Sequence, residues 1–217
     1  MTMKGITFGN LHSFNDLRLI LTSKEIGSPE IKVRKIEIEG ADSAIDYTDF
    51  FGEPKYSDVT HKFNFSTIVH QAEFLSLFST VKNALHGKKM RIILDDDPLF
   101  YYVGRLNVSS FTNEKNIGNI SVEADCEPYK YKLAKTVVSK TVNGTATVVL
   151  VNGRKRAVPE VNITTAGTIR IEFQGVNIWD LGSGSFTLPE LELVEGDNTI
   201  SLTGTGTVVF TWQEGDL

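Results

Sequence analysis

The sequence predicts a mainly β protein with a single α-helix in its N-terminal part. Apolar and polar residues alternate in many short segments, which is the pattern of half-buried strands. Only residues 74–85 have the spacing of an amphipathic helix. A lysine-rich stretch with few large apolar residues, 129–140, divides the chain. We therefore predict an N-terminal domain over residues 1–130 and a C-terminal domain over 131–217.

Two simple strands are predicted before the helix. Leu17, Leu19 and Leu21 alternate within residues 16–22, and a later segment places Phe63 and Phe65 on one face. Successive side chains of a strand point to opposite faces, so each set marks one buried face.

A third, irregular strand is predicted over residues 31–39. Ile31 and Val33 share one phase of the alternation, whereas Ile36 and Ile38 take the other. A phase change of one residue inside a strand is typical of a β-bulge. The pattern therefore predicts a bulged strand.

The helix is predicted from one apolar stripe at positions i, i+3, i+4, i+7 and i+11. Its members are Phe74, Leu77, Phe78, Val81 and Leu85. Gly87 follows the stripe, where a left-handed residue commonly ends a helix.

A β-hairpin is predicted directly after the helix. Two apolar runs, 90–94 and 99–106, flank the acidic turn Asp95-Asp96-Asp97-Pro98. A further strand is expected near 119–125.

The C-terminal domain has no helical periodicity and is predicted to be an antiparallel β-sandwich. A buried-strand run, 148–151, ends at the turn pair Asn152-Gly153. Alternating apolar residues follow in three more segments, and the last two are separated by Gly204-Thr205-Gly206, which we interpret as a turn. These segments are 169–173, 200–202 and 208–212. Short strands between frequent turn signals favour a sandwich.

Composition excludes several classes of protein. The 217 residues are 41% hydrophobic and 23% charged, as in an ordinary globular protein. The formal net charge of −5 gives no basic excess for a phosphate backbone, so no specific nucleic-acid binding is expected. No run approaches the ~18 apolar residues of a membrane span. The lone cysteine and the absence of a signal-like N-terminus suit synthesis in a reducing cytoplasm.

No catalytic or metal site is predicted. The three carboxylates of Asp95-Asp96-Asp97 are consecutive, whereas calcium loops space their ligands at alternate positions, so a solvated turn is the better interpretation. The histidines lack zinc-site spacing, and Cys126 has no nearby histidine to activate it. No cofactor is expected, and nothing pairs a nucleophile with a base.

The two tryptophans leave one binding alternative open. Trp212 is in phase with Val208 and Phe210, which indicates a core residue. Trp179 precedes a glycine turn and is the candidate sugar contact of a lectin-like domain.

A series of motifs in the first ~125 residues, together with the chain end, resembles one protein family. The series reads Phe8-Gly9, strand 16–22, the segment from Pro29 to Gly40, Asp46-Tyr47-Thr48, Tyr56 ahead of Phe63 and Phe65, the helix closing at Leu85-His86-Gly87-Lys88, the acidic hairpin with Tyr101 to Arg105, Pro128-Tyr129-Lys130, and Phe210 to Leu217. In this order the motifs resemble the distal tail proteins, called Dit, of siphophages. His61-Lys62 stands where members of that family carry an arginine.

The resemblance implies a non-enzymatic protein of the phage tail tip. The N-terminal domain would close a hexameric ring at the distal end of the tail, and such rings can stack. The C-terminal domain would be a galectin-like β-sandwich. The implied partners are the major tail protein and the tail-associated lysin or tail fibre. The ring can also anchor a receptor-binding protein, and the protein would be located in the virion.

Two alternatives remain at the level of sequence. One is a carbohydrate-binding module that uses Trp179, and the other is a tail-tube subunit that polymerises into long tubes. For the ring, we expect contacts from the loop between Asp46 and Tyr56 and from the acidic hairpin. The candidate interface residues are Asp46, Tyr47, Tyr56, Asp95, Asp96, Asp97, Tyr101 and Arg105.

Overall fold

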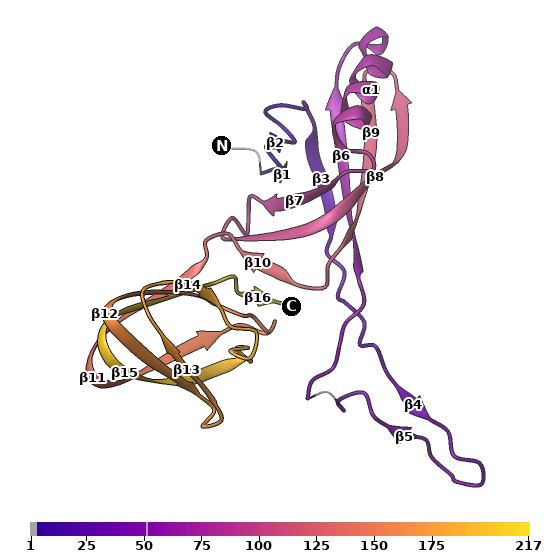
Figure 1. Cartoon of the computed structure of the whole chain (residues 1–217). Helices are drawn as coiled ribbons and strands as arrows, with labels where there is room; N and C mark the ends of the chain where they lie inside the picture. The colour runs from indigo at the N-terminus through magenta and orange to yellow at the C-terminus, as the bar shows by residue number, and fades with distance from the viewer. Residues whose placement is uncertain (1–3, 51) are drawn as a thin grey trace. The chain divides into compact units, whose positions relative to one another are not determined.

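The computed structural model describes residues 4–50 and 52–217 (Figure 1). The chain forms two compact units, Met1–Lys130 with Leu217, and Tyr131–Asp216, which we call unit 1 and unit 2. Both units are built mainly from antiparallel strands, and the described residues contain one α-helix. The predicted fold class, mainly β with one helix in the N-terminal part, is confirmed. No helix among these residues is long and apolar enough to span a membrane.

Unit 1 contains a twisted antiparallel sheet with the strand order β2-β1-β7-β8-β9-β6-β3. Its strands are β1 (Ile6–Phe8), β2 (Leu11–His12), β3 (Ile20–Glu25), β6 (Val59–Ile68), β7 (Lys89–Leu94), β8 (Phe100–Glu114) and β9 (Ile117–Cys126). The predicted hairpin is confirmed, since β7 and β8 pair on either side of the acidic turn.

The core of unit 1 lies on one face of this sheet. Residues of β6 alternate between buried and exposed, and Phe63 and Phe65 point inward as predicted. Both rings meet Phe8 edge to face, with centroids 6.0 and 6.2 Å apart. Such aromatic pairs add about 0.5–1.5 kcal/mol beyond the burial of their area.

Helix α1 (Phe74–Leu85) follows a 3₁₀ turn, η1 (Gln71–Glu73), and packs beside β8. Its predicted stripe is confirmed: Phe74, Val81 and Leu85 are buried, and the other two members are half-buried against the core. Gly87 has φ of 77°, the left-handed conformation predicted after the helix.

The ring of Phe74 occupies space that is free only because residue 118 of the sheet is a glycine. A Cβ atom on Gly118 would lie 1.7 Å from Cε1 of Phe74. We therefore expect Gly118→Ala to lower the free energy of unfolding by about 1–3 kcal/mol, because the ring must move out of its packed position. Chemical unfolding followed by circular dichroism measures this. Gly167→Ala, where no atom lies within 4 Å of the new Cβ, is the control; equal losses in both variants would contradict the packing argument.

The predicted strand over residues 16–22 is wrong in its position. Arg18 adopts φ of 57°, and the Leu19 N–H donates to the Ser13 carbonyl, so this part of the chain is a turn. Leu17 and Leu19 are nevertheless buried, and the strand β3 begins only at Ile20. The period of two arose from a turn that places alternate side chains in the core.

The predicted bulged strand over residues 31–39 is also wrong. The structure has two short strands here, β4 (Lys35–Ile36) and β5 (Ile45–Asp46), which pair without a register shift. Register shifts occur elsewhere, between Leu21 and Ser23 and between Val108 and Ser110. The apolar residues of 31–39 are exposed, so their change of phase reflects surface positions and not a bulge.

Unit 2 is a five-stranded antiparallel sheet with the order β11-β15-β12-β13, and β14 also pairs with β12. These strands are β11 (Thr136–Asn152), β12 (Glu160–Phe173), β13 (Asn177–Leu181), β14 (Gly184–Thr187) and β15 (Gly196–Trp212). The short strands β10 (Lys130–Lys132) and β16 (Gly215–Asp216) pair with each other.

The three long strands of unit 2, β11, β15 and β12, all bend at the same level of the sheet. Gly144 of β11 is opposite Gly204 of β15, and the register of β12 against β15 shifts between Thr165 and Ile169 at the same level. Gly144 and Gly204 have φ of 89° and 140°. Glycines in strands mark such bends, and Figure 1 shows the curved strands. We call this level, with Gly144, Gly204 and the segment 165–169, the corner.

The corner lets one sheet enclose its own core. Inward residues on both sides of it belong to one buried cluster, for example Val142 with Leu150, and Leu202 with Phe210. The sandwich-like packing thus arises within one sheet, because the part of each long strand before the corner and the part after it face the same core. Gly204-Thr205-Gly206 is not a turn, as we had interpreted it, but lies within β15. Trp212 is buried in the core, as predicted.

Candidate assembly surface

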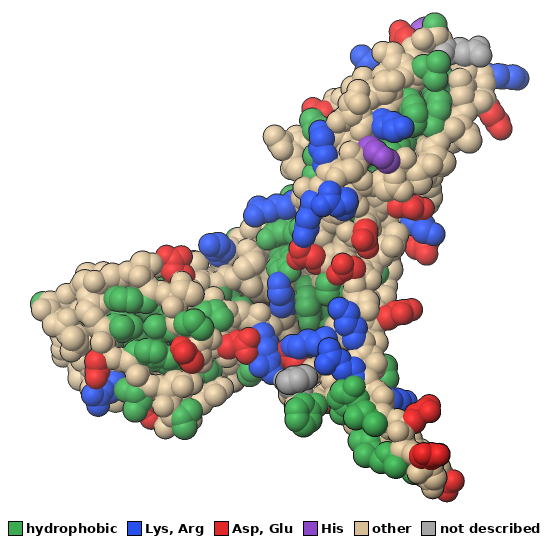
Figure 2. Space-filling model, turned by 45° about the vertical axis from the view of Figure 1, so that its right-hand side comes forward, with side chains coloured by type: hydrophobic (Ala, Val, Ile, Leu, Met, Phe, Trp, Pro, Cys, Tyr) green, Lys and Arg blue, Asp and Glu red, His purple; other side chains and the backbone are tan. Residues whose placement is uncertain are grey.

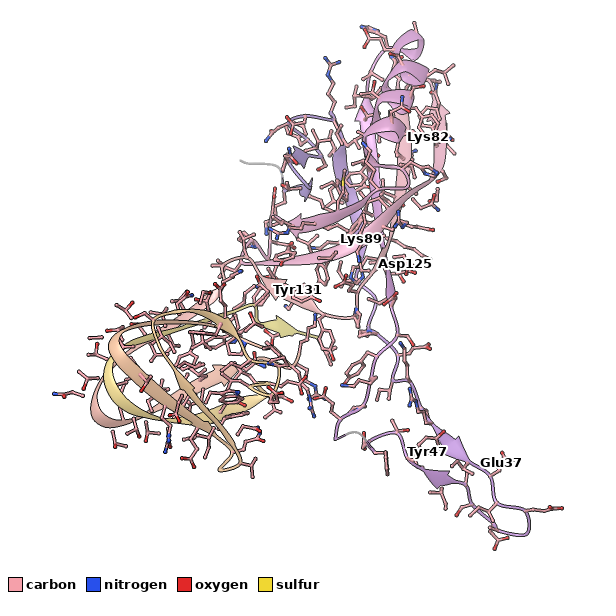
Figure 3. All side chains as sticks on the ribbon, in the orientation of Figure 1. Glu37, Tyr47, Lys82, Lys89, Asp125 and Tyr131 are labelled. Atoms are coloured by element: carbon pink, nitrogen blue, oxygen red, sulfur yellow. The ribbon has the colours of Figure 1, made fainter. Side chains whose placement is uncertain are left out.

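Unit 1 carries a long extension in which the chain runs out and back, described over residues 28–50 and 52–58, which we call the arm. Backbone hydrogen bonds join its outgoing and returning segments near the base. They run from the Ser57 N–H to the Glu30 carbonyl at 2.9 Å and from the Lys32 N–H to the Lys55 carbonyl at 2.7 Å. Further out, Ile36 of β4 is opposite Ile45 of β5. Figure 3 labels Glu37 on the outgoing segment and Tyr47 on the returning segment.

The arm exposes an unusual number of large apolar side chains. The exposed fractions are 50% for Ile31, 59% for Val33, 53% for Ile36, 48% for Ile38, 53% for Ile45 and 77% for Phe50. Figure 2 shows hydrophobic side chains gathered along this extension. Contiguous apolar surface of this kind marks interaction sites in soluble proteins. An isolated two-stranded hairpin is also only marginally stable in water, so burial against another surface would stabilise the arm.

Three predicted interface residues lie in the arm. Asp46 is exposed, and its carboxylate accepts the Thr48 N–H at 2.9 Å; hydrogen bonds from the Thr48 hydroxyl and N–H hold the pKa of Asp46 below its usual value. Tyr47 is half-buried beside it. Tyr56 is at the base, where its ring meets Tyr129 edge to face at 5.9 Å. Asp46 therefore shapes a turn, whereas Tyr56 packs at the base of the arm.

The acidic hairpin turn is occupied by contacts within unit 1. Asp95 accepts the Gly5 N–H at 2.7 Å and lies 3.0 Å from His12 Nε2. Asp96 forms an ion pair with Lys24, whose hydrogen bond is the main cause that lowers the pKa of Asp96.

The other predicted residues of the hairpin also have intramolecular roles. Asp97 lies 3.3 Å from the Lys130 ammonium. Tyr101 is buried, and Arg91 lies 4.6 Å from its ring centroid. Arg105 donates to the Gly87 carbonyl at 2.6 Å and so secures the turn after the helix. The hairpin residues thus join parts of unit 1 to one another, and the structure does not place them on the arm with Asp46 and Tyr47.

Sequence reasoning missed the apolar residues of the arm as a surface. Their signal was present, because alternating isoleucines and valines occurred beside the polar turn segment 40–48. We interpreted the alternation only as the mark of a bulged strand and did not predict an exposed apolar surface from it. Among the described residues, no group of three His, Cys, Asp or Glu side chains is arranged to hold a metal ion.

His61 supports the base of the arm. Its side chain is 1% exposed, and Nδ1 accepts the Gly27 N–H at 3.2 Å, where β3 leads into the arm. The ring also meets Tyr102 at 4.6 Å between centroids and lines a cavity of ≈ 450 Å³. Its Nε2 has no hydrogen-bond partner among the described residues. Burial lowers the pKa of His61 below 6.5.

The lowered pKa of His61 predicts a loss of stability in mild acid. As pH falls below 6.5, the unfolded chain binds a proton at His61 more readily than the folded chain, so the free energy of unfolding decreases. His61→Asn keeps an acceptor near Gly27 but does not titrate. We expect its stability to fall less than that of the wild type between about pH 7 and pH 5, as measured by urea unfolding. Equal slopes in the two proteins would contradict this role.

Trp179, the candidate sugar contact, is on β13 opposite Ile171. Its side chain is half-buried and packs against the core of unit 2. Much of its surface is therefore occupied by packing within the domain, and its role in sugar binding stays a prediction.

Comparison with known proteins finds a solved structure with a similar fold. Neither a family model nor a curated protein sequence matches the chain. The structure is similar to the crystal structure of the Dit protein (gp 19.1) of phage SPP1, described as a paradigm of the hub adsorption apparatus in phages that infect Gram-positive bacteria. The TM-score is 0.73 with 15% sequence identity over 100% of both chains. At this identity the similarity shows the fold alone.

A chain of the activated baseplate of phage p2 is more distantly similar, with a TM-score of 0.48 and 8% identity over 97% of each chain. We draw no argument from it.

Proposed function

We propose that this chain is a distal tail protein, a non-enzymatic structural component of a phage tail tip. The observation that carries the proposal is the similarity to SPP1 Dit over 100% of both chains, which includes both units. The independent resemblance of the motif series from Phe8-Gly9 to Lys130 supports the same conclusion. The protein would then act by assembly, at the distal end of the tail in the virion.

In this role, residues 1–130 would form a ring of six copies, and residues 131–217 would be a galectin-like domain outside the ring contact. The ring would connect the major tail protein to the tail-associated lysin or tail fibre, and could carry receptor-binding proteins. These partners follow from the family resemblance.

The arm is our candidate for the contact between neighbouring copies. A closed ring requires head-to-tail contacts, in which one surface of a copy binds a different surface of the next. An extension with exposed apolar residues on one copy, docked on the body of its neighbour, satisfies this requirement. The exposed isoleucines of 31–45, together with Val33, provide the apolar area that such a contact buries.

Electron microscopy in negative stain, combined with light scattering, tests the proposal on the purified full chain. Discrete six-fold rings are expected. A monomer at all concentrations would contradict the proposal, and long tubes would indicate a tail-tube subunit instead. Binding to a glycan array by a monomeric protein would favour the carbohydrate-binding alternative.

A further inference from the structure

An open edge of the sheet in unit 2 has the features of a pairing site. β11 is the terminal strand in the order β11-β15-β12-β13, so one of its sides makes no ladder in the described structure. It is 17 residues long, contains no proline, and its only charged residue is Lys140. Natural proteins usually blunt such edges with charges, proline or short strands, because an open edge is a template for another strand.

The opposite edge of the sheet is protected in these ways. It is formed by two short strands, β13 with five residues and β14 with four, each of which pairs with one half of β12. Asp180 of β13 forms a two-pronged ion pair with Arg170 of β12, at 2.8 and 2.9 Å. Of the two edges of this sheet, the one formed by β11 is therefore the edge open to another strand.

We infer that β11 pairs antiparallel with β11 of a second copy of this chain, about a two-fold axis at Gly144. The corner fixes the register. Gly144 already lies opposite Gly204, and a neighbouring strand must bend at the same level to continue the sheet. A second β11 meets this condition when its Gly144 is opposite the first.

The side chains are self-complementary in this register. On the exposed face Val137 would be opposite Val151, and Thr141 would be opposite Thr147. Val137 and Val151 are each 59% exposed in the single chain, so pairing gives them an apolar neighbour. Lys140 would face Val148 and not another charge. Cross-strand pairs of this kind contribute to association, whereas opposed like charges oppose it.

The same contact also satisfies the free backbone groups of the edge. Unpaired N–H and C=O groups along β11 would bond to those of the second copy, as in β-strand addition. This contact uses unit 2 only, so it does not depend on the proposed ring or on the arm.

Site-specific cross-linking tests the register on the full chain. We make two single variants, Thr141→Cys and Thr147→Cys, at exposed positions of β11. In the two-fold register a Cys at one position faces the other position, while identical positions are about 20 Å apart, six residues along the strand. Cys126 stays as it is, since it is buried and burial raises its pKa to about 12. Mild oxidation of the mixed variants should therefore yield a disulfide-linked dimer.

Each variant oxidised alone is the matched control and should remain largely monomeric on a non-reducing gel. Equal cross-linking in the separate and mixed samples would overturn the register, and no cross-linking in any sample would overturn the pairing. Ring formation, seen by electron microscopy of the same samples, is scored separately, so failure of this contact is distinguishable from failure of the proposed function.

A second pair of variants tests the same register by charge. Val137→Lys with Val151→Lys places like charges opposite each other, whereas Val137→Glu with Val151→Lys places opposite charges there. The cross-linked yield, with the cysteine variants as background, should fall at least tenfold in the first and recover in the second. Equal yields in both would overturn the proposed pairing.

Discussion

Ile36→Asp combined with Ile45→Lys is expected to abolish ring formation while leaving the fold of unit 1 intact, because the two new charges are opposite in sign and face each other on the arm. These two residues are opposite each other on the arm and are each 53% exposed, so the folded single chain loses little. Each isoleucine is already about half covered in the single chain, so a contact that buries it fully adds about half of the ~1.5–3 kcal/mol of a complete burial. Losing both weakens association roughly 10–10²-fold, and the cost of desolvating two charged groups weakens it much further.

The measurement is the concentration dependence of particle size by light scattering, with negative-stain images at the highest concentration. Ile178→Asp is a matched control, because Ile178 is 52% exposed but lies on β13 of unit 2. It should form rings as the wild type does. Rings of normal size in the Ile36/Ile45 variant would show that the arm is not the ring contact.

A third variant distinguishes the arm from the acidic hairpin. Leu99 is 72% exposed beside the turn Asp95–Pro98. If the hairpin carried the ring contact, as we expected from sequence, Leu99→Asp would disrupt the ring. Since the carboxylates of the turn are engaged within unit 1, we expect Leu99→Asp to assemble normally.

The parts of the fold that the sequence predicts correctly are those where local pattern and burial agree. The stripe of helix α1 and the alternation of Phe63 and Phe65 both face a core within their own unit. The β7–β8 hairpin is also local, since its turn residues join strands that are adjacent in sequence. In each case the pattern and the surface that buries it come from the same part of the chain.

Prediction fails where that agreement is lost. Alternation over 31–39 reports apolar residues at period two but not which surface covers them, and here the single chain leaves each of them about half exposed. The segment 16–22 fails for another reason: a left-handed turn at Arg18 brings Leu17 and Leu19 to the core without a strand.

The candidate interface was only partly accessible to sequence reasoning for a related reason. Acidic residues in a turn, such as Asp95 and Asp96, look exposed and available. Their partners, the Gly5 N–H and the Lys24 ammonium, are 90 and 72 residues away and appear only in the folded chain. Long-range pairing of this kind has no local signal.

The corner of unit 2 leads to the second large effect: Gly204→Ala is expected to destabilise unit 2 strongly. A Cβ at Gly204 would lie 2.7 Å from the Thr168 carbonyl oxygen and 3.2 Å from Cα of Ile169. Both atoms belong to the backbone of β12, so neither can rotate away. The φ of 140° adds strain for any residue with a Cβ. We expect a loss of about 2–5 kcal/mol, a large part of the ~5–15 kcal/mol that stabilises a typical domain.

Gly144→Ala separates the two causes, because φ at Gly144 is 89° but no atom lies within 4 Å of the new Cβ. It should cost only the backbone strain, about 1–2 kcal/mol. Urea unfolding of the full chain, followed by the fluorescence of Trp179 and Trp212, reports on unit 2 because both tryptophans belong to it. If Gly204→Ala cost no more than Gly144→Ala, close approach of β12 and β15 could not be what shapes the corner. A larger cost would mean that the bend depends on the close approach of β12 to β15 at Gly204.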